Sequence, residues 1–522
     1  MFKEIRYFLF LSFILFSFSA CQNRNSGIEY IPKDALGVFS LNLKSLTKKV
    51  AWSALADSRI LSELAHAGKE EGSFDINATG IDPLSTIYAF GLPDQRLESK
   101  FKFLLVLPIK DKKKFEEYLK ATFPLTKWDY SEQKTFMFID QYSCIAWDEH
   151  TAIGAFTSPS EYDLVNADEV KIILKEDILK SFSLPKEQSL VEDKIFVNLQ
   201  KEENDFGFWF NLESFTKAIP KDEFNVAGAI LSAQKNLVNN TYITGGLNFK
   251  KGKIQIDGKY VYNPSSKALL KTFTDVTYKE DLIRQIPGQQ LNLIAHLQLN
   301  PKGIPALLDT IGMMPLTNMA LKENGLDPES VFNVLEGDFL FSIVDFNFGQ
   351  LTDYLSQTME GKSGAPFFQS ALSFYVKDKL VMENILVFAV KNKLILKSNS
   401  GAYKLKDNYL AFKDKYVVVS HDENTAIRLV NNTKLNDKWA IPNAIKNTPF
   451  GLFVDVKNTT KDFISSLPSA EEGTRILKIL DNITLNGGKM NGDFSDFHLD
   501  ISLQNKEENS LLQLIRLKNE TP

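Results

Sequence analysis

Asn42-Leu43-Lys44-Ser45-Leu46-Thr47-Lys48 is the stretch that decides the fold, because the chain repeats it. Asn211-Leu212-Glu213-Ser214-Phe215-Thr216-Lys217 is a close copy, and Asp455-Val456-Lys457-Asn458-Thr459-Thr460-Lys461 is a looser one. A weaker fourth version is Gln298-Leu299-Asn300-Pro301-Lys302. Each copy follows an alternating apolar run, a pattern typical of a strand that ends where a helix begins.

The runs in front of these copies alternate strictly. In the first run, Phe39, Leu41 and Leu43 share one face. The other runs place Phe208, Phe210 and Leu212, then Leu293, Ala295 and Leu297, then Leu452, Val454 and Val456 on one face. Because successive side chains of a strand point to opposite faces, each run predicts a half-buried strand whose apolar face belongs to a core.

Other segments recur in the same order. Gly80-Ile81-Asp82-Pro83-Leu84-Ser85 resembles Gly325-Leu326-Asp327-Pro328-Glu329-Ser330, and the block that starts at Asp148 resembles the block that starts at Asp422. Hairpin signals follow at Gly252 and at Asn491-Gly492. The order predicts an internal duplication: an α+β fold of two similar halves, with largely antiparallel sheets and helices packed on one face.

A chain of 522 residues is too long for one typical core, so more than one domain is expected. An insertion into the second half is expected at Phe348 to Pro366, which is rich in loop-forming residues. The predicted organisation is a lipoprotein signal peptide at 1–20, a polar tether at 21–29, a first half at 30–265, a helical connector at 266–285, a second half at 286–508 and a C-terminal tail at 509–522.

The N-terminus predicts export. Lys3 and Arg6 precede an apolar run from Tyr7 to Phe18, which is typical of a signal peptide. Cys21 follows Ser-Ala, as in the lipobox of bacterial lipoproteins, and this resemblance implies that Cys21 is lipidated and becomes the mature N-terminus. Two or three acyl chains anchor a protein stably. The alternative is an ordinary secretory signal with an incidental cysteine.

The residues after Cys21 predict a location in the cell envelope. Position 22 is not Asp, which by resemblance to lipoprotein sorting favours the outer membrane, and a tether without an acidic cluster favours its periplasmic face. The net charge of −5 gives no reason to expect a nucleic-acid partner. Cys144, the only other cysteine, is expected to be a buried strand residue.

The repeated stretch also argues against one enzymatic interpretation, in which its serine is a nucleophile. Ser45-x-x-Lys48 and Ser214-x-x-Lys217 fit the first motif of serine penicillin-binding proteins and β-lactamases, but the partner motifs do not occur in the sequence. Asn458 replaces the serine in the third copy. Serine and asparagine share no nucleophilic role, but both cap helices, so we interpret Ser45 and Ser214 as helix N-caps.

Motifs for other chemistry are absent from the sequence. The five histidines show no zinc spacing, and no phosphate-binding or dinucleotide-binding glycine loop occurs. We interpret His150 and His421 as exposed turn residues, and the acidic residues after Asn491-Gly492 as a hairpin turn and a solvated strand, not a calcium site. No catalytic, cofactor-binding or metal-binding residue is therefore predicted.

The lipobox, Ile31-Pro32-x-Asp34-Ala35, the strand end at Asn42 and Trp147-Asp148 together make the chain resemble a family of Bacteroidetes lipoproteins, domain of unknown function 4836. The resemblance covers nearly the whole mature chain. It implies a source and an envelope location, but no reaction, cofactor or catalytic residue.

The leading hypothesis is a non-enzymatic binding or scaffold lipoprotein whose partner is an envelope protein or a glycan. One alternative is an unrecognised glycan or peptidoglycan hydrolase, which requires paired carboxylates across a cleft. Another is a surface glycan-binding lipoprotein, which predicts exposed aromatic side chains gathered in one patch.

Overall fold

The computed structural model divides the chain into two compact units. Unit 1 comprises Met1–Ala56 and Lys69–Phe210, and unit 2 comprises Asp57–Gly68 and Asn211–Pro522. The structure describes residues 27–49, 78–94, 96, 101–131, 133–157, 167–218, 235–274, 281–286, 288–346, 368–432, 442–466 and 472–519.

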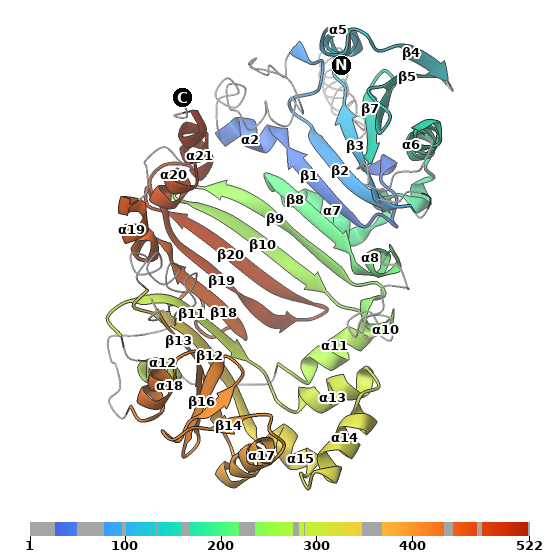
Figure 1. Cartoon of the computed structure of the whole chain (residues 1–522). Coiled ribbons are helices and arrows are strands. Elements are labelled where there is room, and N and C mark those ends of the chain that lie inside the picture. The colour runs from blue at the N-terminus through green and yellow to red at the C-terminus, as the bar shows by residue number, and fades with distance from the viewer. Residues whose placement is uncertain are drawn as a thin grey trace, which may run out of the picture. The chain divides into compact units, whose positions relative to one another are not determined.

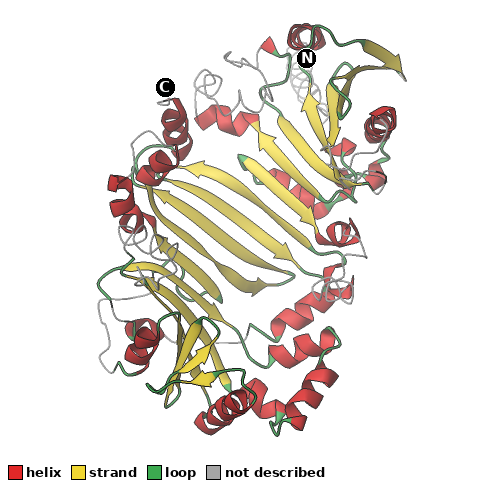
Figure 2. Cartoon of the chain, in the orientation of Figure 1, coloured by secondary structure: helices red, strands yellow, loops and turns green. Residues whose placement is uncertain are grey.

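Unit 1 contains one antiparallel sheet (Figures 1 and 2). Its strands pair in the order β8-β1-β2-β3-β7-β6-β5-β4. Their bounds are β1 (Gly37–Asn42), β2 (Thr86–Pro93), β3 (Phe101–Pro108), β4 (Trp128–Ser131), β5 (Lys134–Phe138), β6 (Ser143–Trp147), β7 (Thr151–Thr157) and β8 (Phe206–Asn211).

The helices of unit 1 begin at residues suited to helix starts. Asp111 caps α5 (Lys112–Thr122), and Asp193 caps α7 (Lys194–Lys201), each accepting a hydrogen bond from the backbone N–H three residues ahead. α7 packs Phe196 against Trp209 of β8, with ring centroids 6.0 Å apart. The remaining helices are η1 (Ile28–Tyr30), α2 (Leu43–Lys49), α6 (Ala167–Phe182), η3 (Lys186–Gln188) and η4 (Leu190–Glu192).

Unit 2 contains a longer antiparallel sheet, in which strands pair in the order β9-β10-β20-β19-β18-β11-β12-β13-β17-β16-β15-β14. The bounds are β9 (Tyr242–Lys250), β10 (Lys253–Val261), β11 (Leu291–Gln298), β12 (Leu335–Val344), β13 (Gln369–Val376), β14 (Leu396–Lys397), β15 (Tyr403–Leu405), β16 (Asn408–Lys413), β17 (Tyr416–Ser420), β18 (Phe450–Asp455), β19 (Leu480–Asn491) and β20 (Phe494–Leu503).

Helices pack beside this sheet, and α18 contributes to one of its hydrophobic cores. Ile294, Leu340 and Val418 form a buried cluster with Ala426 and Leu429 of α18. The helices are α8 (Leu212–Ala218), α10 (Lys235–Val238), α11 (Pro264–Lys271), α12 (Asp281–Arg284), α13 (Gly303–Thr310), α14 (Met314–Glu323), α15 (Pro328–Asn333), α17 (Lys379–Lys391), α18 (Glu423–Val430), α19 (Val456–Ser466), α20 (Glu472–Ile479) and α21 (Ser510–Asn519).

The predicted α+β class with largely antiparallel sheets is confirmed, and the two units pair their strands in the same order. In unit 1, β1 lies between β2 and β8, and β3 pairs with β7. In unit 2, β11 lies between β12 and β18, and β13 pairs with β17. A duplication would produce this order, and the duplication itself stays a prediction.

One pair of repeated segments agrees with this order and another does not. Gly80 and Gly325 precede β2 and β12, with φ of 74° and 75°. Asp148, in contrast, forms the turn before β7, whereas Asp422 caps α18 after β17. Aligning these two blocks was therefore wrong. The turn and the helix cap each need an aspartate that accepts backbone N–H bonds, and this shared requirement explains why the two sequences are similar.

The predicted boundaries differ from the division into units. The hairpin of β9 and β10 falls within the predicted first half, 30–265, but β10 pairs with β20 in the sheet of unit 2. The connector at 266–285 includes most of α11 and all of α12. The predicted tail contains α21, whose Leu511 and Ile515 are buried. The tether ends at η1, where Ile28 is buried.

Several predictions lie outside the described residues. These are the signal peptide, Cys21, and the insertion at 348–366. Both predicted hairpin turns are present: Gly252 adopts φ 63° between β9 and β10, and Gly492 adopts φ 65° between β19 and β20. No helix in the described part of the chain is long and apolar enough to cross a bilayer.

Candidate functional site

The two faces of β1 decide where the core lies. Val38 is 1% exposed and belongs to the buried face, whereas its neighbour Phe39 is 56% exposed. The alternation that predicted a strand is therefore confirmed, but the face assigned to the core was wrong. The side that carries Phe39 and Leu41 is the open one, and the side that carries Val38 and Ser40 packs inside.

The same inversion occurs in β8 and β11, the strands before the second and fourth copies. In β8, Trp209 is fully buried while Phe206 is exposed and Phe208 and Phe210 are half-buried. In β11, Ile294 and His296 are buried while Leu297 is 45% exposed. The larger or more regular apolar set faces outward, so alternation alone could not identify the core side.

In unit 1 these outward side chains form one continuous surface, which we call the open face of unit 1. Cross-strand registers place them side by side: Phe39 pairs with both Ala89 and Phe208, and Phe103 pairs with Phe156. The rings of Phe103 and Phe156 stack 5.4 Å apart. The face consists of Phe39, Leu41, Ile87, Ala89, Phe103, Leu105, Phe156, Phe206, Phe208 and Phe210.

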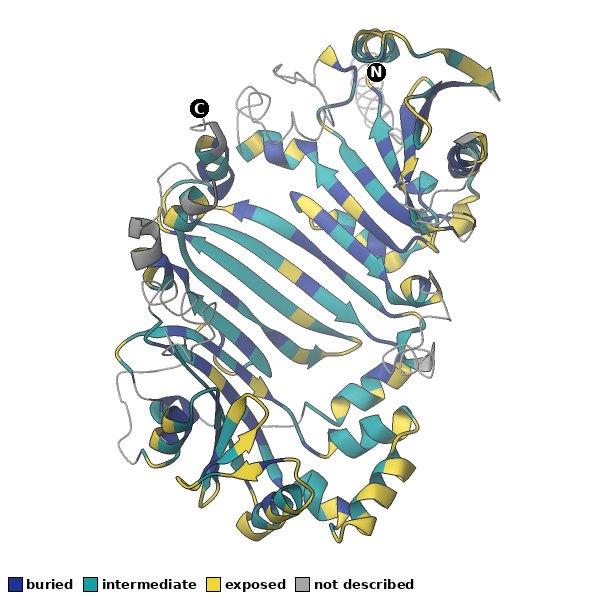
Figure 3. Ribbon diagram, in the orientation of Figure 1, coloured by how far each residue is buried: buried dark blue, intermediate teal, exposed yellow. Residues whose placement is uncertain are grey.

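Unit 2 has a corresponding surface, the open face of unit 2, which follows one line of cross-strand partners. Phe341 and Leu297 on this face are exposed, and most of its other side chains are half-buried, as the colouring of β9, β10, β20 and β19 shows (Figure 3). The partners in this line are Leu372, Phe341, Ala295, Leu452, Leu485, Leu499, Ile256 and Leu247. At this line, each of the eight strands contributes an apolar side chain.

Such continuous apolar surface has an energetic meaning. Each square ångström of apolar area left in water forgoes roughly 25 cal/mol. Single exposed apolar residues are normal, but contiguous apolar patches on monomeric proteins mark binding surfaces. The opposite side of β10 and β20 carries Asp257, His498 and Asp500, which interact with one another. The sheet is thus amphipathic there, with its apolar side partly open.

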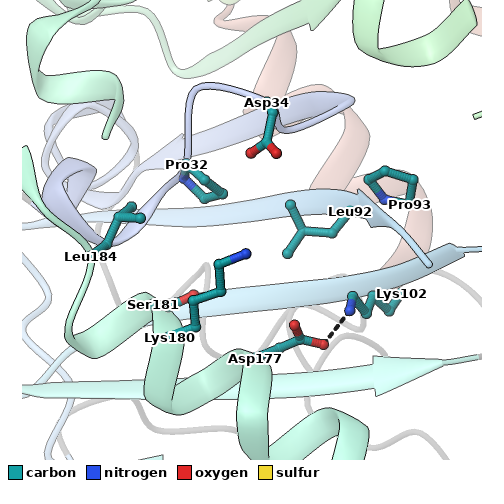
Figure 4. Close-up of a pocket in the computed structure, with 9 residues that line it drawn as sticks. All are labelled: Pro32, Asp34, Leu92, Pro93, Lys102, Asp177, Lys180, Ser181 and Leu184. Carbon is teal, nitrogen blue, oxygen red and sulfur yellow. Dashed lines mark ion pairs between the residues drawn. The ribbon is translucent and has the colours of Figure 1, made fainter. Parts of the chain in front are cut away.

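The buried face of unit 1 contains a second feature, an ion cluster around Lys102. Lys102 lies in β3 with Leu104 and Val106, and its side chain is 5% exposed. Its Nζ lies 2.7 Å from Asp94 Oδ2. Figure 4 shows its second ion pair, with Asp177 of α6. Arg96 donates to both oxygens of Asp94, from Nη2 to Oδ2 at 2.7 Å and from Nε to Oδ1 at 3.0 Å. The cluster fastens α6 to the sheet.

The two carboxylates of this cluster differ in acidity. Burial favours the neutral form of Asp94, but hydrogen bonds from Arg96 and Lys102 outweigh it and hold its pKa below the usual range. For Asp177, burial outweighs the stabilisation by Lys102, so its pKa is raised. Opposite shifts in neighbouring carboxylates also occur in acid–base catalysis. Here, however, Lys102 lies between them and occupies both.

A small cavity of about 90 Å³ adjoins Lys102 and Asp177. Asp34, Lys180 and Ser181 also line it (Figure 4). A volume of this size can hold water molecules. The sequence contained one signal for the cluster, a lysine at an inward position of the apolar run Phe101 to Leu107, and sequence reasoning missed it.

The helix caps lie three residues earlier than predicted. Asn42 Oδ1 accepts the backbone N–H of Ser45 at 3.0 Å, and Asn211 Oδ1 accepts that of Ser214 at 3.1 Å. Asp455 does the same for Asn458 at 3.0 Å. The prediction that these stretches contain helix caps is thus confirmed, but Ser45 and Ser214 are not the caps. They lie inside the first turn and donate their backbone N–H groups to the caps, because the helices already begin at Leu43 and Leu212.

Ser45 has a different contact. Its Oγ donates to Asp205 Oδ1 at 2.7 Å, and Lys49 Nζ lies 2.5 Å from Asp205 Oδ2. Lys48, the motif lysine, does not take part in this interaction. A carboxylate can accept a proton, but here it is held by both groups and fully buried. The arrangement links α2 to the start of β8.

The histidines are also placed individually. His150 is exposed, as interpreted, but His421 is half-buried, with Ser370 Oγ 2.9 Å from its Nδ1 and the ring of Phe368 5.1 Å away. The interpretation of His421 as exposed was wrong. His296 is buried, and its Nε2 donates to the Ile445 carbonyl at 2.7 Å. Burial lowers the pKa of both His296 and His421.

Cys144 is 1% exposed in β6, as predicted for a buried strand residue. Burial raises the pKa of its thiol to about 12, so the thiolate is not formed at neutral pH. Among the described residues, no group of three or more histidine, cysteine or acidic side chains is arranged to hold a metal ion.

The fold and these surfaces define an α+β protein of two antiparallel-sheet units, each with a partly exposed apolar face. A family model described as a domain of unknown function, DUF4836, matches residues 28–460. The chain therefore belongs to this family. No curated protein matches the chain.

Three solved structures with distant similarity are crystal forms IV, III and I of TP0453. Each is 10% identical to this chain. The TM-scores are 0.27, 0.26 and 0.26. The matches cover 48%, 48% and 45% of this chain and 87%, 88% and 78% of the respective TP0453 chains.

Proposed function

We propose that this chain is a lipid-anchored lipoprotein of the outer membrane that binds an apolar partner without catalysing a reaction. The observation that carries the proposal is the pair of open faces. In each unit the regular apolar set of the strands is turned outward, although burying that set would stabilise the fold. An apolar surface that the fold leaves partly exposed is suited to cover a hydrophobic ligand or the apolar surface of a partner.

The same observation weighs against glycan binding. Exposed aromatics do gather in one patch, as that alternative requires, but they are phenylalanines among aliphatic side chains. Trp147 and Trp209 are fully buried. Sugars need hydrogen-bonding groups beside an aromatic ring, since their hydroxyls otherwise lose water without replacement. The line of cross-strand partners in unit 2 offers only apolar side chains.

A photo-crosslinking residue tests the proposal in intact envelopes. Benzoylphenylalanine at Phe103, 44% exposed on the open face, is expected to give an adduct of one defined mass. The matched control is the same residue at Ile172, which is 57% exposed on α6. Adducts at neither Phe39 nor Phe103, or equal adducts at Ile172, would contradict the proposal.

Location requires a separate test. We propose the periplasmic face of the outer membrane, from the lipobox and the tether that lacks acidic residues. Protease added to intact cells should leave the chain uncut and should cleave it after the outer membrane is opened. Cleavage on intact cells would place the chain on the cell surface.

A further inference from the structure

The end of unit 2 formed by α17, β14 and β15 combines two surface properties. Leu394 is 59% exposed and Leu396 63%. Lys393 precedes Leu394, Lys404 lies opposite Leu396 in the register of β14 and β15, and both lysines are exposed. We call these four residues the lysine–leucine patch.

The charge of this region contrasts with the rest of the chain. Residues 391–415 contain seven lysines and two aspartates, whereas the whole chain has a net charge of −5. One of the two, Asp414, lies 3.5 Å from Lys379. Among the described residues, no carboxylate lies within 4 Å of the ammonium group of Lys393 or Lys404, although the charge of Lys404 also acts on Glu423. The region thus keeps an excess of positive charge.

The strand register brings the two kinds of side chain together. Leu396 pairs with Lys404, and Lys404 pairs with Tyr409, so the three side chains share one side of this small sheet. Ile395 next to Leu396 is buried in a core with Met382 and Leu386 of α17. The backbone under the patch is therefore held by a packed core, while the leucines of the patch face solvent.

We propose that the lysine–leucine patch contacts the surface of an anionic phospholipid bilayer. Leucines can enter the boundary between head groups and acyl chains, while the lysine stems lie along this boundary and their ammonium groups stay at the phosphates. Each lysine near an anionic surface contributes about 1 kcal/mol, which is roughly a fivefold change in affinity. Charge complementarity thus favours a bilayer over an uncharged partner. This contact is separate from the open faces.

Vesicle sedimentation tests the proposal with the chain from residue 22 onward, so that no acyl anchor contributes. The chain should bind phosphatidylglycerol–phosphatidylethanolamine vesicles and bind phosphatidylcholine vesicles at least about tenfold more weakly. Lys393→Glu with Lys404→Glu should lower the affinity at least about tenfold. Leu394→Ser with Leu396→Ser should also lower it, and because both leucines are exposed the fold should remain intact.

The matched control is Lys457→Glu with Lys461→Glu, which makes the same change in net charge at exposed lysines of α19. This variant should bind like the unmodified chain. Equal affinity for phosphatidylcholine vesicles, an equal loss in the control, or unchanged affinity in either patch variant would overturn the proposal. Crosslinking at Phe103 reports on the open face independently.

Discussion

The buried and open faces of each sheet are both largely apolar, and they differ in where polar side chains lie. The buried face of unit 1 contains Lys102 and Ser40, and that of unit 2 contains His296. The open faces carry phenylalanine and aliphatic side chains. Polar residues are tolerated inside because they have partners, such as Asp94 for Lys102 and the Ile445 carbonyl for His296. Which face of a strand is buried is thus decided by the helices and partners that cover it, because both faces carry apolar side chains.

The largest expected effect comes from removing the charge at the centre of the buried face. Lys102→Ala leaves Asp94 and Asp177 buried without their shared cation, and we expect a loss of about 3–5 kcal/mol in the free energy of unfolding of unit 1. Denaturant unfolding followed by tryptophan fluorescence measures it, since Trp147 and Trp209 are buried in this unit. Lys113→Ala, at a lysine whose side chain is 87% exposed, is the control and should change little. Equal stability of both variants would refute the role of the cluster.

Neighbouring residues of β1 give the most direct comparison of the two faces. Val38→Ala should cost about 2 kcal/mol, because Val38 is 1% exposed and its loss leaves a cavity. Phe39→Ser should change stability by no more than about 0.5 kcal/mol, although it removes the larger apolar side chain. Thermal and denaturant unfolding of the two variants measure the difference. A larger loss for Phe39→Ser would mean that the face described as open is covered in solution.

This comparison also separates what the sequence could predict from what it could not. Alternation located β1, β8, β11 and β18, and the glycines located two hairpin turns. Alternation specifies that a strand has two different faces, but which face is covered depends on helices from distant parts of the chain, such as α7 against Trp209. No local pattern carries that information. The same holds for Asp177, which reaches Lys102 from a helix far along the sequence.

A fall in pH from 7 to 5 should act on unit 2 through its buried histidine, His296. Burial lowers the pKa of His296, so the folded state takes up a proton less readily than the unfolded state. Between the ordinary histidine pKa of about 6.5 and the lowered folded value, the unfolded state binds more protons, so stability falls as pH falls through this window. The loss approaches about 1.4 kcal/mol per pH unit for one group.

Denaturant midpoints of unit 2 between pH 7 and 5 measure this slope. His296→Gln should reduce the slope, since its amide does not titrate. His150→Gln is the matched control, because His150 is an exposed turn residue. An unchanged slope in His296→Gln would exclude this histidine as its source, and the lowered pKa of His421 would then be the next group to test.

The smallest effect concerns the stretch that repeats along the chain. Asn42 lies at the end of β1 in register with the buried-face residues Val38 and Ser40, and its Oδ1 accepts the N–H of Ser45. Asn42→Ala should therefore cost about 1 kcal/mol of unit 1 stability, the usual effect of losing a helix cap. Asn42→Asp should retain most of it, because Asp455 caps the third copy in the same way. Ser45→Asn tests the earlier assignment directly: a cap at position 45 would tolerate asparagine, whereas the contact with Asp205 makes this position sensitive to the change. If Ser45→Asn is silent while Asn42→Ala is costly, the hydrogen bond to Asp205 contributes nothing, and Asn42 alone holds the strand–helix junction.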